Sequence, residues 1–291
     1  MTPVHHRHAP IDGHQLFYRE AGPADAATIV LLHGYPTSSF MFRELIPRLA
    51  GRLHVIAPDH LGFGLSDAPP VTEFEYSFDA LADSTYKLLQ HLSVDRYVIY
   101  VQDYGAPIGW RLVLQHPTSV TAIVTQSGNG YDEGFVESFW QPVWDYQAQQ
   151  TPETEAAIRV ALGLDAIRWQ YLHGVADPSV VSPDTWHHDH ALVARPGNDL
   201  VQLKLFLDYA SNPPLYSKLQ EHLRATQLPV LAVWGAEDQI FSPAGAEAFR
   251  RDVTAAEIHL VDGGGHFLLE SHGQLVAQLI LDFIPRVTPN R

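Results

Sequence analysis

The sequence predicts an α/β fold, in which a helical segment is inserted into a mostly parallel, doubly wound sheet. Short apolar runs that suit buried strands alternate with segments that suit helices as far as Ser127, and again from Pro229 onwards. Alternation of this kind is typical of parallel sheets with helices on both faces. Between those two points the alternation stops, and the sequence becomes helical in character and unusually aromatic.

Five strands are expected before the insertion. The run Ile29-Val30-Leu31-Leu32 is continuously apolar, as expected for a strand buried on both faces, and Gly22-Pro23 marks the turn before it. The expected elements are, in order, strands at 14–20 and 27–33, a helix at 40–50, a strand at 53–57, a helix at 79–93, a strand at 97–102, a helix at about 106–115 and a strand at 120–124.

The alternation resumes after the insertion with a strand at 229–234, a helix at 243–252, a strand at 256–261 and a helix at about 273–284. We therefore expect a sheet domain formed by residues 1–128 and 226–291, and a helical cap formed by residues 129–225. The cap contains Trp140, Trp144, Trp169 and Trp186. An aromatic insertion at this point predicts a lid over the carboxyl ends of the strands, where folds of this kind bind ligands.

Composition restricts the partners. The chain has 291 residues, of which 46% are apolar, and 33 acidic against 18 basic side chains give a net charge of −15. Nucleic acids and anionic membranes attract basic surfaces, so we expect neither as a partner. The absence of cysteine excludes disulfides, thiolate zinc sites and cysteine catalysis.

No segment has the features of a membrane span or a targeting signal. A span needs about 18 consecutive apolar residues, and the N-terminal residues lack the apolar centre of a signal peptide. We expect a soluble, cytoplasmic protein that is a monomer or a homodimer and needs no cofactor. The histidines at 5, 6 and 8 and in the run 187–190 lack the spacing and third ligand of a metal site, so no bound metal is expected.

The most informative residue is Asp103. The strand before it ends abruptly, and Gly105 lets the chain turn at once into a helix. A reactive side chain at such a strand-to-helix turn is usually the serine of a G-x-S-x-G sequence, but here the sequence is Val101-Gln102-Asp103-Tyr104-Gly105. A carboxylate in this position suits attack on an electrophilic sp³ carbon rather than an acyl carbonyl, so a serine esterase is not expected.

Two further residues complete a candidate catalytic triad. Asp238 follows the strand that ends in Trp234-Gly235, with Glu237 as a neighbouring alternative, and His266 follows three glycines after the last strand. Strand-end loops at one edge of a parallel sheet converge in space, so these residues can meet Asp103. The order nucleophile, acid, histidine is that of α/β-hydrolases.

Each member of the triad has an expected role. Asp103 attacks carbon and forms an alkyl ester, and His266 then deprotonates the water that hydrolyses it, while Asp238 orients the imidazole. The oxyanion of this second step develops on Asp103 itself and needs backbone donors. We expect these to be the N–H groups of Tyr104 and Tyr35.

At these residues the chain resembles the aspartate-nucleophile α/β-hydrolases, which include soluble epoxide hydrolases and haloalkane or haloacetate dehalogenases. The sequence His33-Gly34-Tyr35-Pro36 is similar to their H-G-x-P loop, and residues 58–66 are similar to their D-x-x-G-x-G-x-S turn. The segments ending in Asp238 and around His266 also match, so the resemblance covers nearly the whole chain. It implies the α/β-hydrolase fold with an inserted helical cap.

The subgroups of this family differ in how the leaving group is stabilised. Haloalkane dehalogenases place a tryptophan directly after the nucleophile and often an asparagine in the H-G-x-P loop; this chain has Tyr104 and Tyr35 there. Epoxide hydrolases carry an aromatic residue in that loop and use two lid tyrosines. The resemblance implies Tyr146, in the sequence Trp144-Asp145-Tyr146-Gln147, as the first of these.

The second lid tyrosine matches less closely. Tyr209 stands one place early in a segment similar to the family's, and Ala210 occupies the donor's place. One residue on a helix is a turn of about 100°, so Tyr209 is expected to aim elsewhere. Replacement donors in the lid are Tyr171, Trp186 and His187.

Three functions compete. The leading hypothesis is hydrolysis of a small apolar epoxide, with water, to a vicinal diol. The alternative enzyme is a haloalkane or haloacid dehalogenase, although a haloacid would favour an arginine next to the nucleophile, where Tyr104 stands. The third hypothesis, from another class, is a pseudo-enzyme that binds a ligand under the lid. The neutral, aromatic lid favours an apolar ligand over a sugar or a phosphate.

Overall fold

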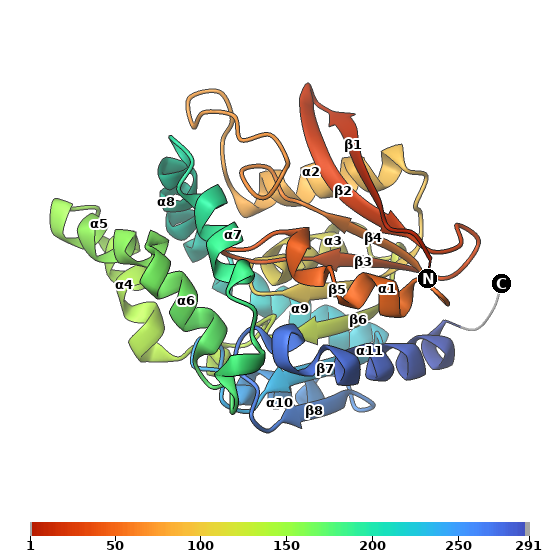
Figure 1. Cartoon of the computed structure of the whole chain (residues 1–291). Coiled ribbons are helices and arrows are strands. Elements are labelled where there is room, and N and C mark those ends of the chain that lie inside the picture. Colours follow the sequence, from red (N-terminus) through yellow and green to blue (C-terminus); the bar gives the residue numbers. More distant parts are fainter. Residues whose placement is uncertain (1, 289–291) are drawn as a thin grey trace.

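An eight-stranded sheet runs through the centre of the molecule in the computed structural model, which describes residues 2–288 (Figure 1). The strands lie in the order β1-β2-β4-β3-β5-β6-β7-β8. Their bounds are β1 His5–Ile11, β2 His14–Ala21, β3 Thr28–Leu32, β4 His54–Pro58, β5 Tyr97–Gln102, β6 Val120–Gln126, β7 Val230–Gly235 and β8 Glu257–Val261. All pairs from β4 to β8 are parallel, and β2 is antiparallel to β1 and β4. The predicted α/β fold with a mostly parallel sheet is confirmed.

Helices cover both faces of the sheet. The core helices are α1 Leu45–Leu49, α2 Phe78–His91, α3 Gly105–Gln115, α10 Pro243–Ala248 and α11 Leu268–Val287. Helix α1 packs against α11, and α2 packs against α3 (Figure 1). This two-layer cover excludes water from the central strands, and every residue of β5 is buried.

The single helix expected at 40–50 is two elements, the 3₁₀ helix η1 Ser39–Phe42 and α1. Pro47 explains the break, because it has no N–H to bond to the carbonyl of Arg43 and is tolerated only in a first helical turn. The Ser38 hydroxyl accepts a hydrogen bond from Phe40 N at 3.2 Å and begins η1. The remaining 3₁₀ helices are η2 Asp132–Gly134, η3 Val160–Leu162, η4 Pro178–Val180, η5 Tyr209–Ser211 and η6 Phe249–Arg251.

The inserted segment forms helices α4 Glu137–Ala148, α5 Pro152–Arg159, α6 Leu164–Leu172, α7 Asp184–Val193, α8 Asn198–Asp208 and α9 Pro213–Thr226. Figure 1 shows α4 to α8 gathered at one end of the sheet, while α9 packs against α3 of the core. The sequence boundary at 225/226 stays a prediction, but the last helix of the insertion already lies with the core.

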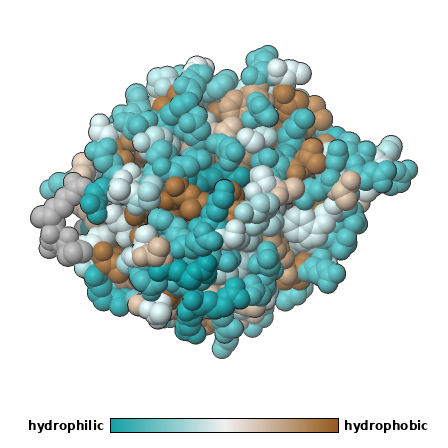
Figure 2. Space-filling model, turned by 180° about the vertical axis from the view of Figure 1, so that it is seen from behind, coloured by the Kyte–Doolittle hydropathy of each residue, from teal (hydrophilic) through white to brown (hydrophobic). Residues whose placement is uncertain are grey.

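Hydrophilic residues cover most of the face seen from behind, with hydrophobic residues scattered between them (Figure 2). Within residues 2–288, no helix combines the length and the hydropathy that a membrane crossing requires.

A buried arginine connects the core to the insertion. Arg111 on α3 is 3% exposed, and its guanidinium donates to Asn212 Oδ1 and to Ser211 Oγ, both at 2.8 Å. It also pairs with Asp79 on α2. Guanidinium groups bind several acceptors at once in a fixed geometry, so this side chain holds the junction between α8 and α9 against the sheet domain.

We predict that Arg111→Met lowers the free energy of unfolding by about 2–4 kcal/mol, because buried acceptors lose their charged donor. Urea denaturation measures the effect. Arg250→Met is the control, since Arg250 is exposed, and it should change stability by less than about 0.5 kcal/mol. Equal losses in the two variants would contradict the role given to Arg111.

Candidate active site

Asp103 lies at the sharp turn between β5 and α3, with a φ of +48°. A non-glycine residue rarely adopts this left-handed conformation, and such residues concentrate at functional sites. Two glycines make the turn possible. A Cβ on Gly34 would lie 2.3 Å from Asp103 Cβ, and one on Gly105 would lie 2.2 Å from Leu32 O. The backbone therefore approaches the carboxylate more closely than any larger residue allows.

One carboxylate oxygen of Asp103 sits in an oxyanion hole. Tyr35 N donates to Asp103 Oδ1 at 2.7 Å, and the backbone N–H of Tyr104 also donates to this carboxylate. Both donors were expected from the sequence. The other oxygen, Oδ2, lies 3.9 Å from His266 Nε2. The carboxylate is thus held at one oxygen and directed toward the histidine with the other.

His266 is oriented from its far side by Asp238. His266 Nδ1 lies 3.1 Å from Asp238 Oδ2. The second oxygen of Asp238 accepts from Ile240 N at 2.8 Å and from Phe241 N at 3.1 Å, so the carboxylate cannot turn away. Glu237 instead accepts from Gly263 N at 2.9 Å. The structure therefore brings Asp238, and not its neighbour, to the imidazole.

The oxyanion loop is supported by a buried pair of histidines. His33 Nδ1 donates to Gly34 O at 3.0 Å, and His33 Nε2 accepts from His60 N at 3.1 Å. Burial lowers the pKa of His33 to about 4, so its imidazole is neutral at physiological pH. This neutral ring holds the loop that presents Tyr35 N without placing a second cation beside Asp103.

Burial and charge act in opposite directions on the reacting groups. Burial raises the pKa of Asp103, and His266 and the two backbone donors oppose that rise only in part. Burial also disfavours the charged form of His266, but Asp238 and Asp103 outweigh it and raise the pKa of the imidazole. The two pKa shifts are therefore both upward, and each group is one of the charges that act on the other.

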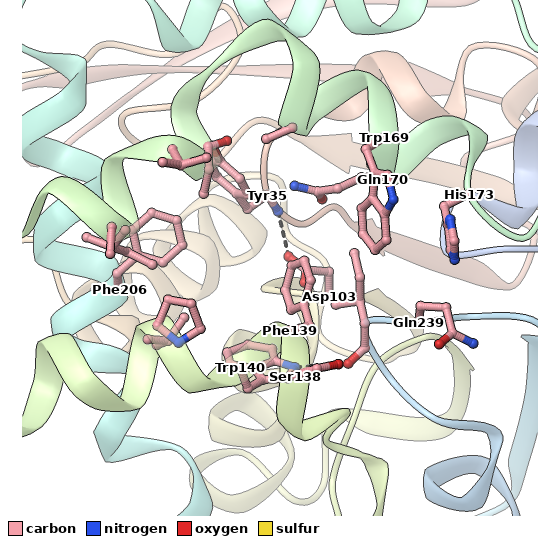
Figure 3. Close-up of a pocket in the computed structure, with 18 of the residues that line it drawn as sticks. Tyr35, Asp103, Ser138, Phe139, Trp140, Trp169, Gln170, His173, Phe206 and Gln239 are labelled. Atoms are coloured by element: carbon pink, nitrogen blue, oxygen red, sulfur yellow. Dashed lines mark hydrogen bonds between the residues drawn. The ribbon is translucent and has the colours of Figure 1, made fainter. Parts of the chain in front are cut away.

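A cavity of about 430 Å³ opens above Asp103 between the sheet and the cap (Figure 3). Its walls are largely apolar and include Phe139, Trp140 and Phe206. Its polar side chains are Ser138 on α4, Gln170 on α6, and His173 and Gln239 in the loops that follow α6 and Asp238. In Figure 3, Asp103 lies at the centre, with its hydrogen bond to Tyr35 drawn. The cavity suits a small apolar molecule that approaches the carboxylate from the cap side.

Of the binding residues expected from the sequence, Tyr35 and Tyr104 line this cavity, whereas Tyr146, Tyr209 and Trp186 are not among the described lining residues. Tyr146 lies on α4 beyond Phe139 and Val143, which do face the cavity. The ring of Tyr209 packs 4.5 Å from Trp140, behind the wall that Trp140 forms.

Trp186 and the two other suggested replacement donors also lie outside the described lining. Trp186 on α7 packs 6.3 Å from the ring of Tyr171, whose hydroxyl donates to Asp189. His187 follows on the same helix. For Tyr209, a position outside the described lining agrees with the one-place offset in sequence that was expected to aim it elsewhere, and substrate-binding roles for Tyr146 and Trp186 stay predictions.

Sequence reasoning missed Gln170, Trp169, His173 and Gln239. Gln239 directly follows the triad acid, and that position was a usable signal. Gln170 and His173 are three residues apart, which is the spacing of neighbours on one helix face. That spacing does not show from the sequence that this face lines a cavity. Trp169 stacks on His173 with ring centroids 4.5 Å apart, and both line the cavity.

Comparisons with known proteins show the family to which the chain belongs. Residues 27–273 match the family described as the alpha/beta hydrolase fold. The chain belongs to this family and is a hydrolase of the α/β-hydrolase type. It is 45% identical to an uncharacterized hydrolase of Saccharomyces cerevisiae, over 93% of each chain.

More distant relatives include haloalkane dehalogenases. A haloalkane dehalogenase of Mycolicibacterium paratuberculosis is 30% identical, over 92% of this chain and 87% of its own length. The crystal structure of the haloalkane dehalogenase DbeA from Bradyrhizobium elkanii superimposes with a TM-score of 0.81 at 23% identity, covering 98% of this chain and 99% of that one, which shows a shared fold.

The geometry predicts that Asp238→Asn lowers the pKa of His266, because the main charge that raises it is removed. NMR titration of ¹⁵N-histidine-labelled protein measures this, with the His266 signal assigned by its loss in His266→Gln. Glu237→Gln is the matched control and should leave that pKa unchanged, since Glu237 bonds Gly263 instead. A larger drop in the Glu237 variant would reverse the assignment of the triad acid.

Proposed function

We propose that the protein hydrolyses a small apolar epoxide to a vicinal diol through an alkyl ester on Asp103. The observation that carries the proposal is the state of the Asp103 carboxylate. Its Oδ1 already accepts from Tyr35 N at 2.7 Å, Oδ2 lies 3.9 Å from His266 Nε2, and the residue lines the cavity. A carboxylate held in this way is a nucleophile whose later ester carbonyl already lies in its oxyanion hole.

In the first step, Asp103 Oδ2 attacks a ring carbon of the epoxide. A new C–O bond forms as the ring C–O bond breaks, and the electron pair passes to the ring oxygen, which becomes an alkoxide and takes up a proton. His173 is the lining side chain that can supply it, because the Tyr35 hydroxyl donates to Ala161 O at 2.8 Å and the Tyr104 hydroxyl is fully buried. The carboxamide of Gln170 can donate a hydrogen bond to the same oxygen.

In the second step, His266 Nε2 takes a proton from water, and the hydroxide attacks Cγ of the Asp103 ester. The resulting oxyanion forms on Oδ1, which Tyr35 N already contacts at 2.7 Å. The bond between Cγ and the alkyl oxygen then breaks, and the diol leaves with the oxygen that had been Oδ2. The leaving oxygen takes its proton from the imidazolium, whose charge Asp238 has stabilised meanwhile. The new Asp103 carboxyl group then releases its proton to solvent, which restores the proton donor of the first step.

Hydrolytic dehalogenation is the second candidate. The relative from Mycolicibacterium paratuberculosis supports it, and so do the Gln170 amide and the Trp169 indole, because N–H groups on the cavity wall can hold a halide. Against it, the residue after the nucleophile is Tyr104, which offers no indole N–H at that position. A mouse relative named epoxide hydrolase 3, 23% identical over 94% of this chain, supports the first candidate.

We predict that styrene oxide yields its diol, because the proposed ester forms from a strained C–O bond without a halide site. Chromatography of the diol and ion chromatography of bromide from 1-bromobutane measure the two activities. Asp103→Ala is the control and should abolish both. Bromide release without any diol would replace the epoxide assignment with dehalogenation, and the absence of both products would favour a ligand-binding role.

Replacing the base should trap the ester. In His266→Gln, the first step needs only Asp103, whereas ester hydrolysis loses its activated water and should slow by on the order of 10³-fold. Mass spectrometry of the Asp103 peptide should then show the added mass of one substrate. The double variant Asp103→Ala/His266→Gln must show no added mass, and a modified peptide elsewhere in the chain would refute Asp103 as the nucleophile.

A further inference from the structure

Gln102, the last residue of β5, touches the base nitrogen of the triad. Its side chain is fully buried, and its amide nitrogen lies 2.9 Å from His266 Nε2. The Asp103 carboxylate is 3.9 Å from the same nitrogen. Gln102 is therefore the nearer polar neighbour of the atom that must take a proton from water, yet the two-step reaction does not use it.

The contact determines which form of the imidazole the resting site holds. Nδ1 carries the hydrogen that is donated to Asp238, at 3.1 Å. In the neutral ring Nε2 then has a lone pair, which accepts from the Gln102 amide. Asp238 and Gln102 thus contact the two ring nitrogens of His266, one each. Together they favour the tautomer with the proton on Nδ1, which can act as a base at Nε2.

Gln102 has an unused acceptor. Its Oε1 is buried and has no hydrogen-bond partner among residues 2–288. Buried polar atoms are nearly always paired, and an unpaired one calls for an explanation. The nitrogen and oxygen of a carboxamide exchange places when the terminal torsion makes a half turn. Such a turn would release the Nε2 lone pair and bring an acceptor to the same place.

A second glutamine shows the contrast. Gln126, opposite Gln102 on β6, donates to His266 O at 2.7 Å and accepts from the Tyr100 hydroxyl at 2.9 Å. Both ends of its carboxamide are satisfied, and it holds only the histidine backbone. Gln102 instead contacts the reacting nitrogen and keeps one end free. Gln126, with both ends paired, therefore fits a structural role. Gln102, with one unpaired end and a contact to Nε2, fits a partner whose hydrogen bond changes during the reaction.

We propose that Gln102 is a two-position partner of His266: its amide N–H donates to the neutral imidazole at rest, and its carbonyl accepts from the Nε2–H that forms when His266 takes the water proton. The inference rests on the proposed ester mechanism, because only the second step protonates Nε2. A carboxamide suits this task since it is both donor and acceptor. Gln102 is a positioning residue, which acts on the reaction through His266.

The first test separates the two chemical steps. In Gln102→Leu, single-turnover quench with mass spectrometry should show ester formation within about threefold of the unaltered protein. Ester decay should be slowed about ten- to a hundredfold, the effect of one lost hydrogen bond to a charged group. Gln126→Leu is the matched control, and it should not slow decay selectively. Equal slowing of both steps in Gln102→Leu, as for a merely structural residue, would overturn the proposal.

A second variant covers the case in which the leucine variant does not fold. Gln102→Glu keeps the shape but offers only acceptors when ionised, and its charge stabilises the imidazolium. The acidic limb of the ester-decay profile should therefore move to higher pH, because His266 must be neutral to act. An unchanged pH profile in a folded Gln102→Glu protein would refute the contact as a determinant of the protonation state of His266.

Tautomer measurement keeps this inference distinct from the proposed reaction. ¹⁵N shifts of the His266 ring report whether Nε2 accepts a hydrogen bond, with no substrate present. Loss of that signature in Gln102→Leu, and its retention in Gln126→Leu, is the expected result. If the unaltered protein forms no ester with any epoxide or bromoalkane, the proposed function is refuted. Unchanged ¹⁵N shifts of Nε2 in Gln102→Leu would refute the role of Gln102 independently of that result.

Discussion

The left-handed turn at Asp103 is the constraint on which the rest of the site depends. A φ of +48° at the end of β5 places the carboxylate beside the N–H of Tyr104, the residue before α3, and against the loop after β3. The parallel register of β3 and β5, with Leu32 beside Val101, brings that loop to within hydrogen-bond distance. Gly34 and Gly105 leave the space that the close approach needs. The oxyanion hole is therefore built by the same backbone geometry that exposes the nucleophile.

Under the proposed mechanism, this geometry explains how one carboxylate can serve both steps. Burial raises the pKa of Asp103, whereas the backbone donors and the imidazole favour its charged form and oppose that rise in part. Ester formation neutralises Asp103, and this removes one of the charges that raise the pKa of His266. The pKa of His266 consequently falls when the ester forms, which favours the neutral imidazole at the stage where it must act as a base. In the proposed reaction, the charge change at Asp103 thus favours the second step.

The cap contributes shape more than charge. Aromatic packing sets its wall: Trp140 donates its indole N–H to Ile240 O at 2.9 Å and so presents its ring to the cavity rather than a donor. Tyr209 supports that ring from behind. Polar contacts with a ligand fall instead to α6 and to the loop after Asp238, where Gln170 and Gln239 line the cavity.

The sequence by itself predicted every strand except the edge strand β1, the positions of Asp103, Asp238 and His266 at strand ends, and the N–H of Tyr35 as a donor to Asp103, because strand ends and glycine turns are local signals. It did not determine which cap side chains face the cavity. That depends on how each helix is rotated against its neighbours. Helix α8 ends at Asp208 and continues as a 3₁₀ turn, so that Tyr209 packs against Trp140 and does not line the cavity. Tyr146 likewise lies beyond the α4 residues that face the cavity. The contact of Gln102 with His266 joins residues 164 positions apart, so only the tertiary structure decided it.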